Sequence, residues 1–319
     1  MPYSKHIQEF IKVRLEQTPN NTQIARDVRN KFEIDIELDT IRKHVSITRK
    51  KLKIKAKKIP IKRLFFDIET GYYILHIKAW QLRNFQRYFN YDDIIREKEI
   101  ICICYKWEYD DKVYSLDWRM GERKMLKEFV KVMGEADECI AHKGDTFDVP
   151  FIRTRCLYHG VLIFPNYRTL DTLKKSKHGF LFASNALDYL GKFTGIGGKV
   201  DRRAMEQTKA VVEDGDEKEL ENMIHYCKHD VIILSDYYHI ISPFITHNNN
   251  FAVATGGYKW ECPECASSSV EMFRTYYTPM GTIRREMKCN NCKKQYKVSN
   301  KTYMSMLEYL SREQRSNSK

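Results

Sequence analysis

The chain has 319 residues, a formal net charge of +13 at pH 7 and 42% hydrophobic residues, a composition typical of a globular protein with two or three domains. It contains no run of 18 apolar residues, and its first residues lack the apolar segment of a signal peptide. We therefore expect a cytoplasmic protein without a membrane partner.

The positive charge lies at the two ends of the chain. Residues 1–63 carry a net charge of +10 and residues 252–319 a net charge of +6, whereas residues 64–251 carry −3. Basic ends can neutralise the phosphates of a nucleic acid, and an acidic centre suits divalent cations. Solubility alone would not distribute the charge in this way. The pattern predicts a polyanion partner and a central metal site.

Residues 4–52 are predicted to form three short helices. Ser4 and Thr22 are candidate caps of the first two, and the third starts at Asp39 or Thr40. The arrangement resembles a helix-turn-helix, in which the third helix lies in the major groove. Its outward residues would be Arg42, Lys43, His44 and Arg49. A three-helix bundle without a role in nucleic-acid binding is the alternative.

A strongly basic segment follows these helices. Residues 49–63, RKKLKIKAKKIPIKR, contain nine basic residues and no acidic one, which indicates a linker or a basic strand. A solvated charge run is the ordinary explanation, but the position between a reading domain and a catalytic body favours contact with phosphates. The basic residues of this part that we expect to bind nucleic acid are Arg42, Lys43, Arg49, Lys51 and Lys53.

From residue 64 to about 195 the pattern is α/β. Strands are predicted at RLFFDIE, EIICICYKWEYD, DKVYSLDW and ECIAHKG. Helices are predicted at GERKMLKEFVKVMGEA, from FDVPF onward, at NALDYLGKFTGI and from about Glu217 to Ile241. Strands and helices that alternate in this way predict one sheet with helices packed on it.

Four carboxylates stand out in this region. Asp67 and Glu69 are two residues apart on one strand, so both point to the same face and repel each other unless a cation lies between them. Asp148 lies where a loop gives way to a helix, and Asp230 lies on the long helix. Each acid alone has an ordinary structural explanation. Together they suit two hard cations, which would activate water and stabilise the leaving oxygen of a phosphodiester.

The order of these segments resembles the DEDD superfamily of 3′–5′ exonucleases, and within it the proofreading exonuclease domain of family B DNA polymerases. FFDIET, GDTFD and YCKHD resemble the three motifs, and SNALDYLGKFTGIGGKV resembles the segment between the second and the third. The resemblance covers about residues 62–245. It implies a ribonuclease H-like mixed sheet with flanking helices. It also implies that two Mg²⁺ or Mn²⁺ ions bind Asp67, Glu69, Asp148 and Asp230.

One position departs from the family pattern. The family often has Asn five residues before the aspartate of the second motif, where this chain has Lys143. A lysine could contact a phosphate instead, or its presence could weaken substrate positioning. Lys143 is the feature that favours the rival hypothesis of a DNA-binding or adaptor protein on an exonuclease-like scaffold.

The superfamily has a branch with Tyr four residues before the last Asp and a branch with His five residues before it. This chain has both, as Tyr226 and His225. Within a helix, residues four apart share a face, whereas residues five apart differ by about 140°. We therefore expect Tyr226 to point with Asp230 toward the metals, where it would orient or help to deprotonate the attacking water.

Two C-x-x-C pairs follow the α/β region. They are Cys262 with Cys265 and Cys289 with Cys292, a spacing typical of a structural zinc site in a small β-rich ribbon. Arg284 and Arg285 lie among aromatic residues between the pairs, which suits base stacking and phosphate contact. A protein-docking surface is the alternative.

These predictions combine into an α/β protein with a small N-terminal helical domain and a C-terminal β-rich zinc ribbon. The expected parts are a helix-turn-helix over 1–52, a basic linker over 53–63, an exonuclease domain over 64–250 and the zinc ribbon with a short helix (301–311) over 251–319. It would remove nucleotides from the 3′ end of single-stranded or duplex DNA in replication or repair, with a DNA polymerase or replication protein as partner. A non-catalytic adaptor and an exoribonuclease are the alternatives.

Overall fold

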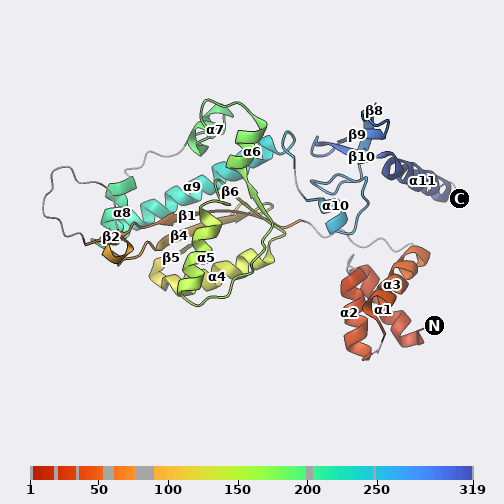
Figure 1. Cartoon of the computed structure of the whole chain (residues 1–319), viewed down its shortest axis with the longest axis horizontal. Helices are drawn as coiled ribbons and strands as arrows, with labels where there is room; N and C mark the ends of the chain where they lie inside the picture. Colours follow the sequence, from red (N-terminus) through yellow and green to blue (C-terminus); the bar gives the residue numbers. More distant parts are fainter. Residues whose placement is uncertain are drawn as a thin grey trace. The chain divides into compact units, whose positions relative to one another are not determined.

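A five-stranded mixed sheet forms the centre of the α/β part of the chain (Figure 1). The computed structural model describes residues 3–17, 21–33, 36–52, 61–76, 90–198, 204–246 and 249–317. Two units are distinguished, Lys62–Ile245 on the one hand and Met1–Ile61 with Thr246–Lys319 on the other. The finer division at residues 52, 63 and 250 stays a prediction.

The strands of the sheet follow the order β5-β4-β1-β6-β7. The central strand β1 (Arg63–Thr70) pairs antiparallel with β4 (Ile100–Trp107) and parallel with β6 (Glu138–Ala141). At the edges, β5 (Val113–Asp117) is antiparallel to β4 and β7 (Thr169–Asp171) is parallel to β6. The mixed sheet that the resemblance implied is confirmed.

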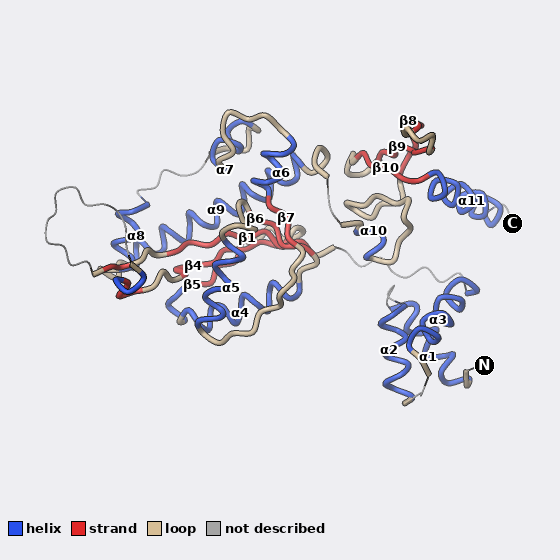
Figure 2. Tube along the Cα trace, in the orientation of Figure 1, coloured by secondary structure: helices blue, strands red, loops and turns tan. Residues whose placement is uncertain are grey.

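Helices cover both faces of this sheet (Figure 2). One face carries α4 (Glu122–Glu135) and α5 (Asp148–Tyr158), and the other carries α9 (Glu217–Ile241). Three shorter helices accompany α9: α6 (Thr172–Gly179), α7 (Leu187–Phe193) and α8 (Ala204–Val212). These helices bury the apolar side chains of both sheet faces.

The alternation of side chains along β1 decides which residues face α9. Phe66 packs against Phe129 of α4, whereas Phe65 packs edge-to-face against Tyr238 of α9. Because side chains alternate between the two faces of a strand, Asp67 and Glu69 are in step with Phe65 and lie on the α9 face. The sheet therefore directs both acids toward the long helix.

The basic segment 49–63 ends inside the sheet, because its last residue is the first residue of β1. Arg63, the last residue of that segment, belongs to the strand and is buried rather than solvated. Its guanidinium donates to Glu108 at 3.0 Å and to Glu138 at 3.2 Å. A buried cation requires such partners, because desolvation without them would be costly. The sequence also did not predict the short strands β2 (Ile74–Leu75) and β3 (Ile94–Arg96).

The N-terminal segment contains three helices, as predicted: α1 (Lys5–Gln17), α2 (Asn21–Phe32) and α3 (Leu38–Leu52). The backbone N–H of Ile7 donates to Ser4 Oγ at 3.4 Å, so Ser4 caps α1. Two boundaries were wrong, since Thr22 lies inside α2 and α3 begins before Asp39. His44 is half-buried against the ring of Tyr3 at 4.5 Å and is not an outward residue.

The C-terminal segment contains a three-stranded antiparallel sheet in the order β10-β9-β8. Its elements are α10 (Phe251–Ala254), β8 (Val270–Tyr277), β9 (Ile283–Cys289), β10 (Gln295–Ser299) and α11 (Asn300–Asn317). The last helix extends beyond the predicted range of 301–311. None of the helices that the structure describes has the length and apolar character needed to cross a membrane.

Candidate active site

The acidic site begins on β1. Asp67 and Glu69 are half-buried on the face that α9 covers. The Sγ atom of Cys227, on α9, lies 3.5 Å from the backbone oxygen of Asp67 and 3.7 Å from its Oδ2. The third motif therefore passes directly beside the carboxylate of the first.

The carboxylate of Asp148 joins this pair from the start of α5. It is buried, and it accepts hydrogen bonds from its own backbone N–H and from that of Ile68, the residue between Asp67 and Glu69. Burial raises the pKa of Asp148 to about 7, and the nearby charges of Asp171 and Glu69 add to the effect. The first and second motifs thus meet at the centre of β1.

The third motif contributes Tyr226 and Asp230, one helical turn apart on α9. Asp230 is buried and Tyr226 is half-buried, whereas His225 is exposed. This exposure pattern agrees with the expectation from helix geometry that the tyrosine, not the histidine, shares the face of Asp230. The catalytic role of Tyr226 stays a prediction.

The structure brings Asp148 to the part of β1 that carries Asp67 and Glu69, and it places Asp230 three residues after Cys227, which contacts Asp67. Two groups of three or more ligand atoms lie within 4.8 Å of one another in the described ranges, and both consist of cysteines. The oxygen donors of the four acids match the ligands that Mg²⁺ and Mn²⁺ prefer.

Asp171 is a residue of this site that the sequence interpretation missed. It lies at the end of β7, buried, and accepts hydrogen bonds from the backbone N–H groups of Lys143 at 3.0 Å and Asp145 at 3.4 Å. It also caps α6 through Leu173, at 3.0 Å. Asp171 therefore fixes the loop that leads into Asp148. The available signal was an aspartate that ends a short apolar strand, in RTLDT.

The loop before Asp148 is held in an unusual backbone conformation. Lys143 has a φ of 74°, in the left-handed region that disfavours most residues with a Cβ atom. At the next position, a Cβ on Gly144 would lie 2.5 Å from Cβ of Ala141, so only glycine fits there. The loop thus packs closely on β6, and the side chain of Lys143 remains exposed.

The remaining basic residues predicted to bind nucleic acid differ in their surroundings. Arg42 and Lys43 are exposed on α3, whereas Lys53 and the side chains of Arg49 and Lys51 lie outside the described part of the chain. On β9, Arg284 is exposed.

Arg285, the neighbour of Arg284 on β9, is half-buried. Its guanidinium donates to Asn300 Oδ1 at 3.0 Å and lies 5.0 Å from the centre of the Tyr303 ring. This side chain therefore ties β9 to the start of α11.

The four ribbon cysteines form a site of their own. The Sγ atoms of Cys262 and Cys292 are 3.5 Å apart, those of Cys265 and Cys289 are 3.7 Å apart, and all four lie within 4.8 Å of one another. Four sulfur atoms at these distances can surround one metal ion. The convergence of the two C-x-x-C pairs is therefore confirmed.

Comparisons with known proteins give one family match and a weak similarity to solved structures. Residues 97–241 match the family model described as the RNase H superfamily. No curated protein matches the sequence significantly. Among solved structures, the chain is similar to the family B DNA polymerase of the hyperthermophilic archaeon Pyrobaculum calidifontis, with a TM-score of 0.45 and 14% identity. The match covers 69% of this chain and 31% of the polymerase, less than a third of its length. The match of residues 97–241 and the mixed five-stranded sheet agree with the ribonuclease H-like fold that the resemblance implied.

Proposed function

We propose that this protein is a metal-dependent 3′–5′ exonuclease that hydrolyses the phosphodiester bonds of DNA. The observation that carries the proposal is the meeting of Asp148 with β1 between Asp67 and Glu69. Burying a carboxylate beside two others is unfavourable without a function for the charge. A nuclease needs such a concentration of oxygen ligands for its cations.

The residues fit two hard cations by their chemistry. Asp67, Glu69, Asp148 and Asp230 would hold them, because all four offer carboxylate oxygens and Asp148 is hydrogen-bonded in a fixed position. When bound, the cations would lower the pKa of the attacking water and stabilise the leaving oxygen. Asp171 would keep the second-motif loop in place through its backbone hydrogen bonds.

Tyr226 would act on the attacking water. Its hydroxyl can both donate and accept a hydrogen bond, so it can orient a water molecule next to the carboxylates. His225 is exposed and would take no part.

The other parts of the chain would bring the substrate to this site. The proposal assigns DNA contact to Arg42 and Lys43 of a helix-turn-helix, and to Arg284 of a ribbon built around one structural Zn²⁺. A replication or repair setting with a DNA polymerase as partner, in the cytoplasm, completes the proposal. None of the cysteines that the structure describes forms a disulfide bond, which suits a reducing compartment.

The test is a cleavage assay with 5′-labelled single-stranded DNA, duplex DNA and RNA, in Mn²⁺ or in EDTA. We expect a metal-dependent ladder that shortens from the 3′ end. Asp67→Ala should abolish it, Tyr226→Phe should reduce the rate by about 100-fold, and the matched control His225→Ala should leave it unchanged. If RNA alone is degraded, the substrate assignment is wrong. If DNA is bound but never cut, the protein is an adaptor on a nuclease fold.

A further inference from the structure

Besides Lys143, one more lysine, Lys98, lies beside the acidic site. Lys98 precedes β4, and its Nζ atom lies 5.0 Å from the ring centre of Phe147 and 5.3 Å from that of Phe151. The two rings are stacked, with their centres 6.0 Å apart and their planes 9° apart. Phe147 directly precedes Asp148, so the cation stands next to the second motif.

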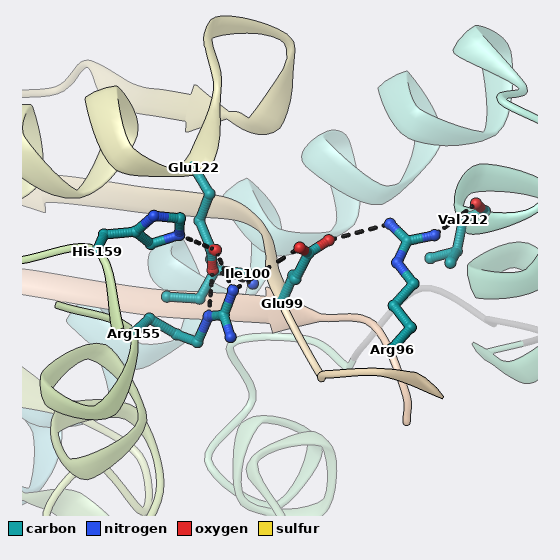
Figure 3. Close-up of polar contacts among 7 residues, drawn as sticks. All are labelled: Arg96, Glu99, Ile100, Glu122, Arg155, His159 and Val212. Carbon is teal, nitrogen blue, oxygen red and sulfur yellow. Dashed lines mark hydrogen bonds and ion pairs between the residues drawn. The ribbon is translucent and has the colours of Figure 1, made fainter. Parts of the chain in front are cut away.

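The residues on either side of Lys98 in the sequence belong to a network of polar contacts (Figure 3). Glu99 accepts from Arg96 at 3.0 Å and lies 3.7 Å from Arg155 of α5, which is in turn paired with Glu122 of α4. The backbone N–H of Ile100 donates to Glu122 at 2.9 Å. The residues on both sides of Lys98 are thereby tied to the helix that carries Asp148, so the backbone of Lys98 is held beside the site.

Lys143 approaches the same aromatic ring from the second-motif loop. Its Nζ atom lies 5.7 Å from the ring centre of Phe147, and its strained backbone is held by Asp171. Left-handed backbone is unfavourable for most residues with a Cβ atom, and asparagine or glycine adopts it more readily. A lysine at this position is therefore unfavourable for stability, which points to a functional use of its positive charge.

Both lysines lack a carboxylate partner within 4.0 Å among the residues that the structure describes. Burial lowers the pKa of Lys98, and the charge of Lys143 acts in the same direction. Two neighbouring cations, one of them half-buried, repel each other unless an anion is shared between them. The nearby Glu69 compensates only part of this charge.

We propose that Lys98 and Lys143 form an anion subsite that binds a backbone phosphate of the substrate strand other than the one being cut. The inference rests on the proposed nuclease function, because it assigns the scissile phosphate to the carboxylate site. Lysine recognises phosphate as a point charge, without reading base or sugar. The subsite would therefore strengthen the binding of substrates with at least two phosphodiesters, and it would do so for DNA and RNA alike.

The variant for the test is Lys98→Met/Lys143→Asn in the full chain. Methionine keeps the aliphatic contact with the two rings, and asparagine tolerates the left-handed backbone, so both changes remove charge with little loss of packing. The control is Lys124→Ala/Lys127→Ala, which removes two exposed lysines of α4. The single variant Lys98→Arg should keep most of the function that the single variant Lys98→Met loses, because arginine keeps the positive charge.

Two substrates separate the subsite from the catalytic centre. A thymidine trinucleotide has two phosphodiesters, whereas the p-nitrophenyl ester of thymidine 5′-monophosphate has one. We expect the double variant to lose about tenfold in kcat/KM on the trinucleotide, through KM, and less than about twofold on the ester. A uridine trinucleotide should show the same loss as the thymidine one. Equal loss on both substrates, or no loss on either, overturns the subsite.

An independent binding measurement keeps the inference testable if the protein cuts neither substrate. In that case the proposed function fails, and the affinity for fluorescein-labelled thymidine trinucleotide in Ca²⁺ decides about the subsite. About tenfold weaker binding by the double variant than by the control, with a salt dependence reduced by about 0.7 in log–log slope, supports it. Binding equal to that of the control refutes it.

Discussion

Asp148→Asn should make the metal-free protein more stable while it removes catalysis. The pKa of Asp148 is raised from 3.8 to about 7, chiefly by burial. A raised pKa means that the protonated acid favours the folded state. This contribution is complete below pH 3.8 and is lost as the pH rises to about 7. Asparagine imitates the protonated acid and should keep that stability at every pH.

The pKa values give the size of the effect. The rise of this pKa from 3.8 to about 7 corresponds to about 4 kcal/mol as an upper limit, and we expect about half of it, a gain of about 2 kcal/mol, in the variant. For a domain of this size the melting temperature should rise by about 4–8 °C. The gain should be largest above pH 7 and should shrink steadily toward pH 4.

Thermal unfolding followed by circular dichroism at pH 5 and pH 8 in EDTA measures this effect. In Mn²⁺ the melting temperature of the wild type should approach or exceed that of the variant. The wild-type carboxylates bind the ion, whereas the variant has lost one ligand. A variant that melts at or below the wild-type temperature at pH 8 would contradict the reasoning. An increase in melting temperature that is the same at pH 5 and pH 8 would also contradict it, because such an increase would not come from the ionisation of Asp148.

Two further predictions concern other parts of the molecule. Removing the ribbon metal with a chelator, or replacing Cys289 by Ser, should unfold the C-terminal sheet and lower the metal content by about one zinc per chain. Spectroscopic loss of β structure and metal analysis test this, and an unchanged spectrum would exclude a structural zinc. Glu122→Gln leaves the buried Arg155 without its main charged partner and should cost about 3 kcal/mol, measured by urea unfolding. The control Glu128→Gln, which removes a surface pair with Lys131, should have a much smaller effect. Equal stability of the two variants would show that the network around Arg155 is unimportant.

The sequence predicted the elements whose signals are local. The strand with Asp67 and Glu69 is a short apolar run that ends in acids, and α4 and α9 are long segments of helix-forming residues. The motif spacing also placed Asp148 at a loop-to-helix boundary, where the structure has it. These features depend on residues that are neighbours in the chain, so they can be read without knowledge of tertiary contacts.

The features that were missed depend on partners far apart in the sequence. Asp171 acquires its importance from backbone groups 26 and 28 residues away. The position of Lys98 depends on a chain of charges that passes through α4 and α5, and the sequence shows these residues only as ordinary charges on amphipathic helices. The boundaries of α2 and α3 were misplaced because Thr22 and Asp39 are good capping residues in general. Which of several candidate caps is used depends on packing.

The buried pairs of Arg63 have a mechanical consequence. Arg63 is where the chain enters the sheet, four residues before Asp67, and its guanidinium joins the end of β4 to the start of β6 through Glu108 and Glu138. A pulling force on the preceding segment, such as tension from a bound polymer, would be shared among three adjacent strands at this point. The carboxylates further along β1 would then keep their spacing while the rest of the chain is under tension.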